Sequence, residues 1–373
     1  MASTGPRVRS YEPADRSRFL SLYETVWGSE KGPAWFRWRF EANPFSDGVP
    51  MVVAEADGDL VGAEPLLELP LRAGDRTLAA AQPVDWIVHP DYRRQGLFTR
   101  MTERLLADCQ DGTDLLFNFP SDALVPGLAK FDWAMVGDVP ARYRIQHPGA
   151  LLSRGDAEST PVRRQLLSGA ETVTRRGLAL LDRLGSPPDD VTVERHESVP
   201  VETIAALYDA TPPAELHVPR TEAYLGWRFA NPRWETRTYL AVRDGDTVGS
   251  VVTATERLGA TTRTLLLDSQ PMGADDGCTD AFEALLARVV ADHRDTDLLR
   301  LPGNVCPPLL RRYGFLADST FPLSRLTKAS THAVRPVSPA LRPDSPEDDW
   351  AISGLDPTDP DDWCLGLADL DVE

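Results

Sequence analysis

WRFEANP, residues 38–44, returns almost unchanged as WRFANP at residues 227–232. A second match follows each copy, because AEADGDLVG (54–62) in the first half resembles AVRDGDTVG (241–249) in the second. An Asp-Gly pair between apolar runs predicts two strands joined by a tight turn, since glycine adopts the positive φ that hairpin turns require. The chain is therefore expected to contain two copies of one structural unit.

The spacing of further matches supports this repeat. Gln82-Pro83 is echoed by Gln270-Pro271, and KFDW (130–133) is echoed by RYGF (312–315). From Trp38 to Gln82 is 44 positions, and from Trp227 to Gln270 is 43. We expect an α+β protein of two tandem units, each a mixed, mostly antiparallel sheet flanked by helices. The expected boundaries are a first unit at 1–150, a helical bridge at 151–187, a second unit at 188–330, and an acidic, Pro-rich, loosely structured tail at 331–373.

The segment HPDYRRQGLF, residues 89–98, lies between a strand-like run and a helix-like run. After it, Leu97, Met101, Leu105 and Cys109 fall on one helical stripe. A helix start offers unpaired N–H groups and a partial positive charge, which suits a phosphate. Gly96 permits close approach of the backbone, and two arginines add charge. An anion site and an ordinary turn with solvent-facing arginines both fit these ten residues.

The pattern V-x-P-x-Y-R-R-Q-G-L resembles the acyl-CoA pyrophosphate loop of the GNAT superfamily of N-acetyltransferases. The family pattern is Gln/Arg-x-x-Gly-x-Gly/Ala. Arg93 and Gly96 fill its first two places, but Phe98 stands where a small residue is usual, which brings a ring near the phosphates. The resemblance covers about residues 5–150 well and 190–328 weakly.

That resemblance implies a splayed central strand whose exposed edge pairs with the pantetheine of acyl-CoA. Asn118, at the end of a strand, either binds the cofactor or caps the next helix. The implied cofactor-binding residues are Ile87, Val88, Arg93, Arg94, Gln95, Gly96, Leu97, Phe98, Thr99 and Asn118.

The second copy lacks such a loop. From Gln82 to Phe131 is 49 positions, but from Gln270 to Tyr313 is only 43. The deficit falls at the loop, where Asp275 and Asp276 replace the arginines and would repel a pyrophosphate. The second copy is therefore expected to have lost acyl-CoA binding and to complete the acceptor pocket.

Acylation of an amine needs a base for the ammonium proton and often an acid for the departing thiolate. The tyrosine that usually serves as the acid in this family is replaced by Leu128 and Leu310. Asp85 and Glu64 are the candidate bases, although either could be a plain strand carboxylate. Trp38 and Trp227 are expected in the core.

Composition limits the partners. The net charge is −18, with 57 acidic and 39 basic residues, and only three of the basic residues are lysines, which resembles a halophile's surface. An acidic surface disfavours nucleic acids, and the chain has neither an apolar run of about 18 residues nor a signal peptide, so we expect a cytoplasmic protein that does not enter membranes. The four cysteines and six histidines show no metal-ligand spacing, so we expect no metal and reduced thiols.

These observations favour an acyl-CoA-dependent N-acyltransferase, with acetyl-CoA as co-substrate and an amine of a small molecule or amino sugar as acceptor. The alternatives are a silent module that binds acyl-CoA or a partner, and an aminoacyl transferase of the tandem type. The oligomeric state is left open. The tail carries Trp363, Leu365, Leu367 and Leu370. It is therefore expected either to extend into solvent or to fold between the units, with Asp369, Asp371 or Glu373 near the acceptor.

Overall fold

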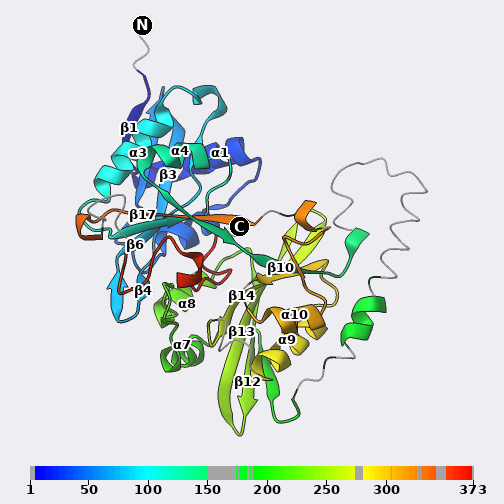
Figure 1. Ribbon diagram of the computed structural model, residues 1–373. Helices are drawn as coiled ribbons and strands as arrows, with labels where there is room; N and C mark the ends of the chain where they lie inside the picture. The colour runs from blue at the N-terminus through cyan, green and yellow to red at the C-terminus, as the bar shows by residue number, and fades with distance from the viewer. Residues whose placement is uncertain are drawn as a thin grey trace, which may run out of the picture.

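The computed structural model describes residues 5–149, 174, 176–182, 185, 188–273, 280–303, 305–321, 323–325, 327, 329–341 and 350–371. Its described elements build two mixed sheets with helices against them, as predicted (Figure 1). Of the predicted bridge, residues 176–182 are helical, and most of the rest lies outside the described residues.

The first sheet follows the order β1-β2-β3-β6-β8-β17-β9, with β7 paired to β3. Its strands are β1 (Arg7–Ser10), β2 (Met51–Ala56), β3 (Asp59–Glu68), β6 (Ala80–Pro83), β7 (Ile87–Val88), β8 (Leu115–Asn118), β9 (Ala134–Val139) and β17 (Ser330–Pro336). Its helices are α1 (Arg16–Trp27), α2 (Pro33–Phe36), the one-turn helix η2 (Arg37–Glu41), α3 (Leu97–Asp108) and α4 (Val125–Leu128). The short pair β4 (Leu71–Ala73) and β5 (Arg76–Leu78) extends from this unit.

Opposite faces of the first sheet hold α1 and α3. Val53 and Ala63 share a core cluster with the apolar side chains of α1, whereas Val52 and Val61 share another with those of α3. This division follows from the two-residue period of strands. The predicted stripe of α3 is confirmed, because its four residues are buried against the sheet.

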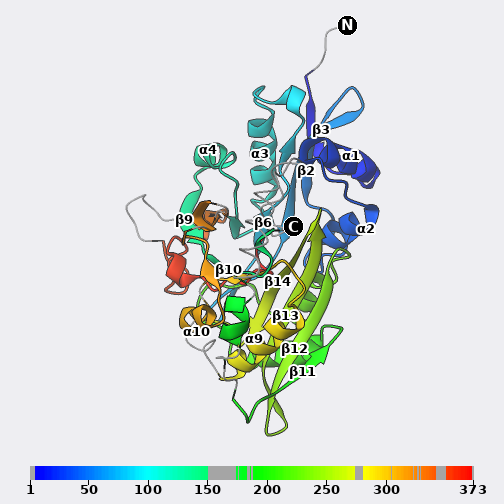
Figure 2. The same ribbon diagram turned by 90° about the vertical axis from the view of Figure 1, so that its right-hand side faces the viewer.

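The second sheet follows the order β11-β12-β13-β14-β15-β10-β16. Its strands are β10 (Ala141–Ile145), β11 (Thr192–His196), β12 (Glu235–Arg243), β13 (Asp246–Leu258), β14 (Thr261–Gln270), β15 (Leu298–Pro302) and β16 (Leu316–Ala317). One face packs against α9 (Asp280–Asp292) and α10 (Pro307–Arg312), and the other against α7 (Val201–Ala210) and α8 (Glu222–Arg228). Figure 2 shows α9 in front of the long strands of this sheet.

Both predicted Asp-Gly turns are confirmed. Asp57 and Gly58 have φ of 53° and 92°, and Asp244 and Gly245 have φ of 53° and 90°. Each pair joins two antiparallel strands, β2 to β3 and β12 to β13. Two consecutive positive φ angles give the tight hairpin turn whose twist matches that of the strands.

The two units exchange a strand. β10 leaves the first unit and pairs with β15 and β16, whereas β17 leaves the second unit and lies between β8 and β9. Figure 1 shows the orange β17 among the strands of the first unit. From the sequence, residues 141–145 were expected in the first unit and residues 331–336 in a loose tail, so the structure corrects both placements.

The repeated tryptophans meet across the boundary between the units. Trp38 Nε1 donates to the backbone oxygen of Trp227 at 2.7 Å, and Trp227 Nε1 donates to that of Trp38 at 2.7 Å. Their rings stack with centroids 6.3 Å apart. This reciprocal pair has the local pattern of a two-fold axis, and it belongs to a core cluster that includes residues of both units. Both tryptophans are buried, as predicted.

Candidate active site

The arginine-rich loop ends at an exposed helix start. Gly96 precedes α3 with φ of 75°, and Arg94 also has a positive φ, of 59°. A Cβ built on Gly96 would meet no atom within 4 Å, so the backbone conformation rather than space calls for glycine. No side chain caps this end of α3, and residues 93–96 are exposed. The first N–H groups of the helix therefore face a site open to an anion.

The two arginines of the loop differ in their surroundings. Arg93 Nε donates to the backbone oxygen of Val88 at 3.1 Å, which ties the loop back to β7. The exposed side chain of Arg94 extends from a residue in the left-handed region. Gln95 Nε2 donates to the oxygen of Asp91 at 2.8 Å, so its amide group stabilises the turn. The loop thus brings two cations to the helix start.

The strands beside this loop diverge. β6 and β8 pair in parallel at Ala80 with Leu115 and at Ala81 with Leu116. Beyond that point β7 pairs with β3, and the described residues show no pairing between β7 and β8. Ile87 and Val88 thus follow the point of divergence directly and lead into the loop. Asn118 is buried at the end of β8, and its Oδ1 accepts from the backbone N–H of Phe119 at 2.7 Å.

Asp85 lies in the turn between β6 and β7, with φ of 49°. Its Oδ2 accepts from Arg39 Nε at 2.7 Å, and Arg39 Nη2 donates to Asp371 Oδ1 at 2.8 Å. Only 1% of the Arg39 side chain is exposed, against 10% for Asp85 and 30% for Asp371. Arg39 thus joins the turn between β6 and β7, the helical turn η2 and the end of the tail.

Glu64 occupies a different environment. It is fully buried beneath α3, where Thr102 Oγ1 lies 3.1 Å from both carboxyl oxygens. Burial raises the pKa of Glu64 well above its usual value. A carboxyl group sealed under a helix does not reach an acceptor amine, and this burial argues against the predicted role of Glu64 as the base.

The positions of the missing tyrosine acid lie in the core. Leu128 and Leu310 have no exposed surface, and they belong to the apolar clusters beneath α3 and α10. They fill space that a phenol oxygen would need to share with water or a partner.

The tail is docked between the units rather than extended in solvent. Trp363, Leu365, Leu367 and Leu370 are at most 6% exposed, and Figure 1 shows this red segment beside both sheets. Of the tail carboxylates expected near the acceptor, Asp369 is only 1% exposed, whereas the side chain of Asp371 is 30% exposed. Glu373 lies outside the described residues.

A network of fully buried charges holds the tail. Arg220 donates to both carboxylate oxygens of Asp369 at 2.8 Å, and its Nε donates to Asp268 Oδ1 at 2.6 Å. The hydroxyl of Tyr224 donates to Asp369 at 2.9 Å. Two carboxylates around one guanidinium raise the pKa of Arg220, although burial alone would lower it. Arg228 adds hydrogen bonds to the backbone oxygens of Ala368 and Leu370.

These buried arginines were not predicted from the sequence. Arg39 and Arg228 are equivalent residues of the repeated Trp-Arg-Phe motif, yet only its tryptophans were considered. The available signal was that both copies of the motif keep an arginine between two aromatic residues. An arginine in such apolar surroundings needs specific partners. Arg220 follows no repeated pattern, so the sequence held no comparable signal for it.

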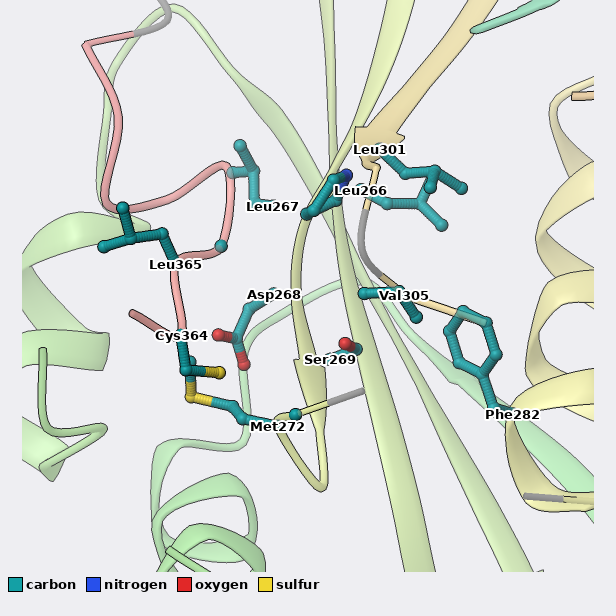
Figure 3. A pocket seen from close by; sticks show the side chains of 13 residues that line it. Leu266, Leu267, Asp268, Ser269, Met272, Phe282, Leu301, Val305, Cys364 and Leu365 are labelled. Carbon is teal, nitrogen blue, oxygen red and sulfur yellow. The ribbon is translucent and has the colours of Figure 1, made fainter. Parts of the chain in front are cut away.

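The second unit has a narrow apolar pocket where its own parallel strands diverge. β14 and β15 pair from Arg263 with Leu298 to Leu265 with Arg300, and the pocket opens beyond. Figure 3 shows Met272 and Cys364 close together on one side and Phe282 on the other. Burial raises the pKa of the Cys364 thiol to about 12. Asp275 and Asp276, predicted to replace the arginines, lie outside the described residues.

The cysteines differ in their state. Cys306 is disulfide-bonded, which contradicts the expectation of reduced thiols throughout. Cys109 and Cys364 are free. No described helix is both long and apolar enough to cross a membrane. Among the residues that the structure describes, no cluster of His, Cys, Asp and Glu is arranged to hold a metal ion.

Comparison with known proteins agrees with this architecture. Residues 7–136 match the family model of the GNAT acetyltransferase domain. A GCN5-related N-acetyltransferase from Anabaena variabilis is 12% identical with a TM-score of 0.58, covering 89% of this chain and 73% of that one. A probable N-acyltransferase from Enterococcus faecalis is 14% identical with a TM-score of 0.59, covering 90% and 73%.

A tandem GNAT protein from the clavulanic acid biosynthesis pathway is also similar. It is 13% identical with a TM-score of 0.53, and the match covers 90% of this chain and 99% of that one. No curated protein matches the sequence. Residues 7–136 thus match a GNAT acetyltransferase domain, and the chain as a whole shares the fold of the tandem GNAT protein.

Proposed function

We propose that the protein is an acyl-CoA-dependent N-acyltransferase with acetyl-CoA as its expected acyl donor. The acyl group is transferred directly to an amine of a small molecule or amino sugar. The observation that carries this proposal is the exposed, uncapped start of α3 beside two arginines, at the point where β6 and β8 diverge. An anion site next to an opened strand suits a long ligand with an anionic end and an amide-bearing arm.

Residues of the first unit have separate roles in this proposal. The amides of residues 95–99, with Arg93 and Arg94, hold the pyrophosphate. Ile87 and Val88 offer backbone groups to the arm, and Asn118 closes the opposite side. Acyl-CoA supplies the activated thioester. Each charge-assisted contact contributes about 1.5–3 kcal/mol, so a few of them suffice to anchor the ligand.

Asp85 is the proposed base. It lies just before β7, partly exposed, and Arg39 holds its carboxylate in place. As the amine attacks the acyl carbon, Asp85 accepts the amine proton, and the sulfur of CoA leaves with the bonding electron pair. Asp371 stands on the other side of Arg39 as part of the acceptor wall.

The test is calorimetric measurement of acetyl-CoA binding. The measurement is made in high salt because the acidic surface resembles that of a halophile's protein. Arg93→Glu with Gly96→Asp should abolish binding while the fold is retained. Arg76→Glu, which makes the same charge change as Arg93→Glu at an exposed residue of β5, is the control and should bind as the unmodified protein does. Equal affinity of the double variant and the control would refute the assignment of the loop.

A silent module that binds acyl-CoA or a partner is the second candidate, because leucines stand at both positions of the usual acid. Steady turnover of acetyl-CoA with a panel of amines would eliminate it. Binding without turnover by any amine would favour it. An aminoacyl transferase remains a third candidate, and competition by aminoacyl-tRNA for the acetyl-CoA site would support it.

A further inference from the structure

The ring of Phe98 does not point into the loop. It lies against two other aromatic rings, with centroids 5.8 Å from Trp86 and 6.2 Å from Phe131, and both contacts are edge-on. Trp86 is fixed in turn, because its Nε1 donates to the oxygen of Pro65 at 3.3 Å. The three rings fill the space between the strand that leads into the loop and α4.

Gly127 of α4 forms the remaining wall. A Cβ built on Gly127 would stand 2.9 Å from one ring carbon of Phe98, closer than real Cβ contacts come, and 3.1 Å from another, so the ring would have to shift. Glycine inside a helix is destabilising relative to alanine by about 0.5–1 kcal/mol, so helix formation does not explain it. The absence of a side chain at Gly127 is what leaves room for the ring.

We propose that Gly127 is a positioning residue of the anion site, because it keeps the ring of Phe98 away from the helix start where the pyrophosphate binds. The proposal rests on the proposed function. Trp86 and Phe131 contact the ring edge-on, and Gly127 of α4 lies against it. Because Phe98 stands in the first turn of α3, we expect a ring displaced from α4 to move toward the amides of residues 95–99. The bulky residue in the loop and the glycine 29 positions later compensate each other.

The experiment is a double-mutant cycle read by acetyl-CoA affinity. Gly127→Ala should weaken binding by about tenfold or more, and Gly127→Leu should weaken it further, since overpacking costs grow with size. Phe98→Ala removes the ring, and in that background Gly127→Ala should change affinity by less than about twofold. The thermal midpoint of Gly127→Ala should change little, because the helix propensity gained by alanine offsets part of the cost of moving the ring.

Acetyl-pantetheine lacks the pyrophosphate, so it provides a control for general loss of structure. A misfolded variant would lose activity with this substrate as well. Its KM should be the same for Gly127→Ala and the unmodified protein. If the unmodified protein binds no acetyl-CoA, the proposed function fails. If it binds, and both Gly127 variants keep its affinity, or the loss persists in the Phe98→Ala background, the positioning role of Gly127 is overturned.

Discussion

The two units use the same divergence of parallel strands in opposite ways. In the first unit, β6 and β8 separate beside an exposed basic loop. In the second, β14 and β15 separate as well, but the backbone N–H of Ala368 donates to the oxygen of Leu267 at 2.9 Å. The tail thus takes a hydrogen bond on the strand edge of the second unit, whose counterpart in the first unit is the proposed site of acyl-CoA. The comparison teaches that the chain itself can cover the edge that such a divergence exposes.

Gly366 shows how closely the tail fits the second unit. A Cβ there would lie 3.0 Å from a guanidinium nitrogen of Arg220 and 3.1 Å from the oxygen of Leu267. Asp369 continues toward the first unit, where its backbone oxygen accepts from Gln82 Nε2 at 3.0 Å. The tail therefore fills one divergence and contacts the other. Four predictions follow from this contrast between an occupied and an open edge.

Removal of residues 363–373 should have the largest effect. It exposes surface that Trp363 and three leucines now cover, at about 1.5–3 kcal/mol for each buried side chain. The sum is comparable with the whole stability of a typical domain. The thermal midpoint of the truncated chain should therefore fall steeply, and its turnover should be abolished. A truncation with unchanged midpoint and turnover would show that the tail only interacts with solvent.

Asp369→Asn should destabilise the protein by about 3–5 kcal/mol, because it leaves Arg220 with one buried carboxylate in place of two. Urea unfolding measures this difference. Asp361→Asn, at an exposed position of the same segment, is the control and should change stability by less than about 0.5 kcal/mol. Equal midpoints of the two variants would mean that the charge network does not hold the tail.

Acid should loosen the contact between the tail and both units. Burial lowers the pKa of His332, which lies against Trp363, to about 3, and that of His217 to about 4. The folded state keeps both rings neutral, whereas the unfolded chain takes up protons below about pH 6.5. This stability is complete above pH 6.5 and is lost as the pH falls toward 4 and 3. Each histidine contributes up to about 1.4 kcal/mol per pH unit.

Urea midpoints at pH 7.5, 6.0 and 5.0 measure this dependence. His332→Phe should make the decline between pH 6.5 and 5 shallower, since one titrating ring is gone. His196→Phe, at a partly exposed position of β11, is the control. A decline as steep in His332→Phe as in the unmodified protein would contradict the role of the buried ring.

Trp38→Phe and Trp227→Phe should have the smallest effects and should resemble each other. Each removes one of two reciprocal hydrogen bonds, worth about 0.5–1.5 kcal/mol, and leaves a backbone oxygen without that donor. Their urea midpoints should fall by similar amounts, and the double variant should show coupling because the rings touch. A large difference between the single variants would mean that the two-fold contact is only superficially symmetric.

Much of the fold was predictable because its signals are local. The two turns were predicted from the Asp-Gly pairs Asp57-Gly58 and Asp244-Gly245, which adopt the expected positive φ. Helix α3 was predicted from a stripe of four apolar residues. The candidate site was less accessible. The location of the loop before α3 agrees with the prediction, but Glu64 is on the face under the helix, and a strand pattern alone does not say what covers each face.

The sequence by itself determined that this protein is a repeat of two α+β units, because the recurrence of residues 38–62 at 227–249 is visible without any contact. It also determined which unit carries the basic loop. Only the tertiary structure decided that β10 joins the sheet of the second unit and β17 that of the first. It also decided that the tail is buried and that Arg39, Arg220 and Arg228 face its carboxylates and carbonyls. Those outcomes depend on pairings between residues more than a hundred positions apart, whose free energy comes from burial and charge that no local pattern encodes.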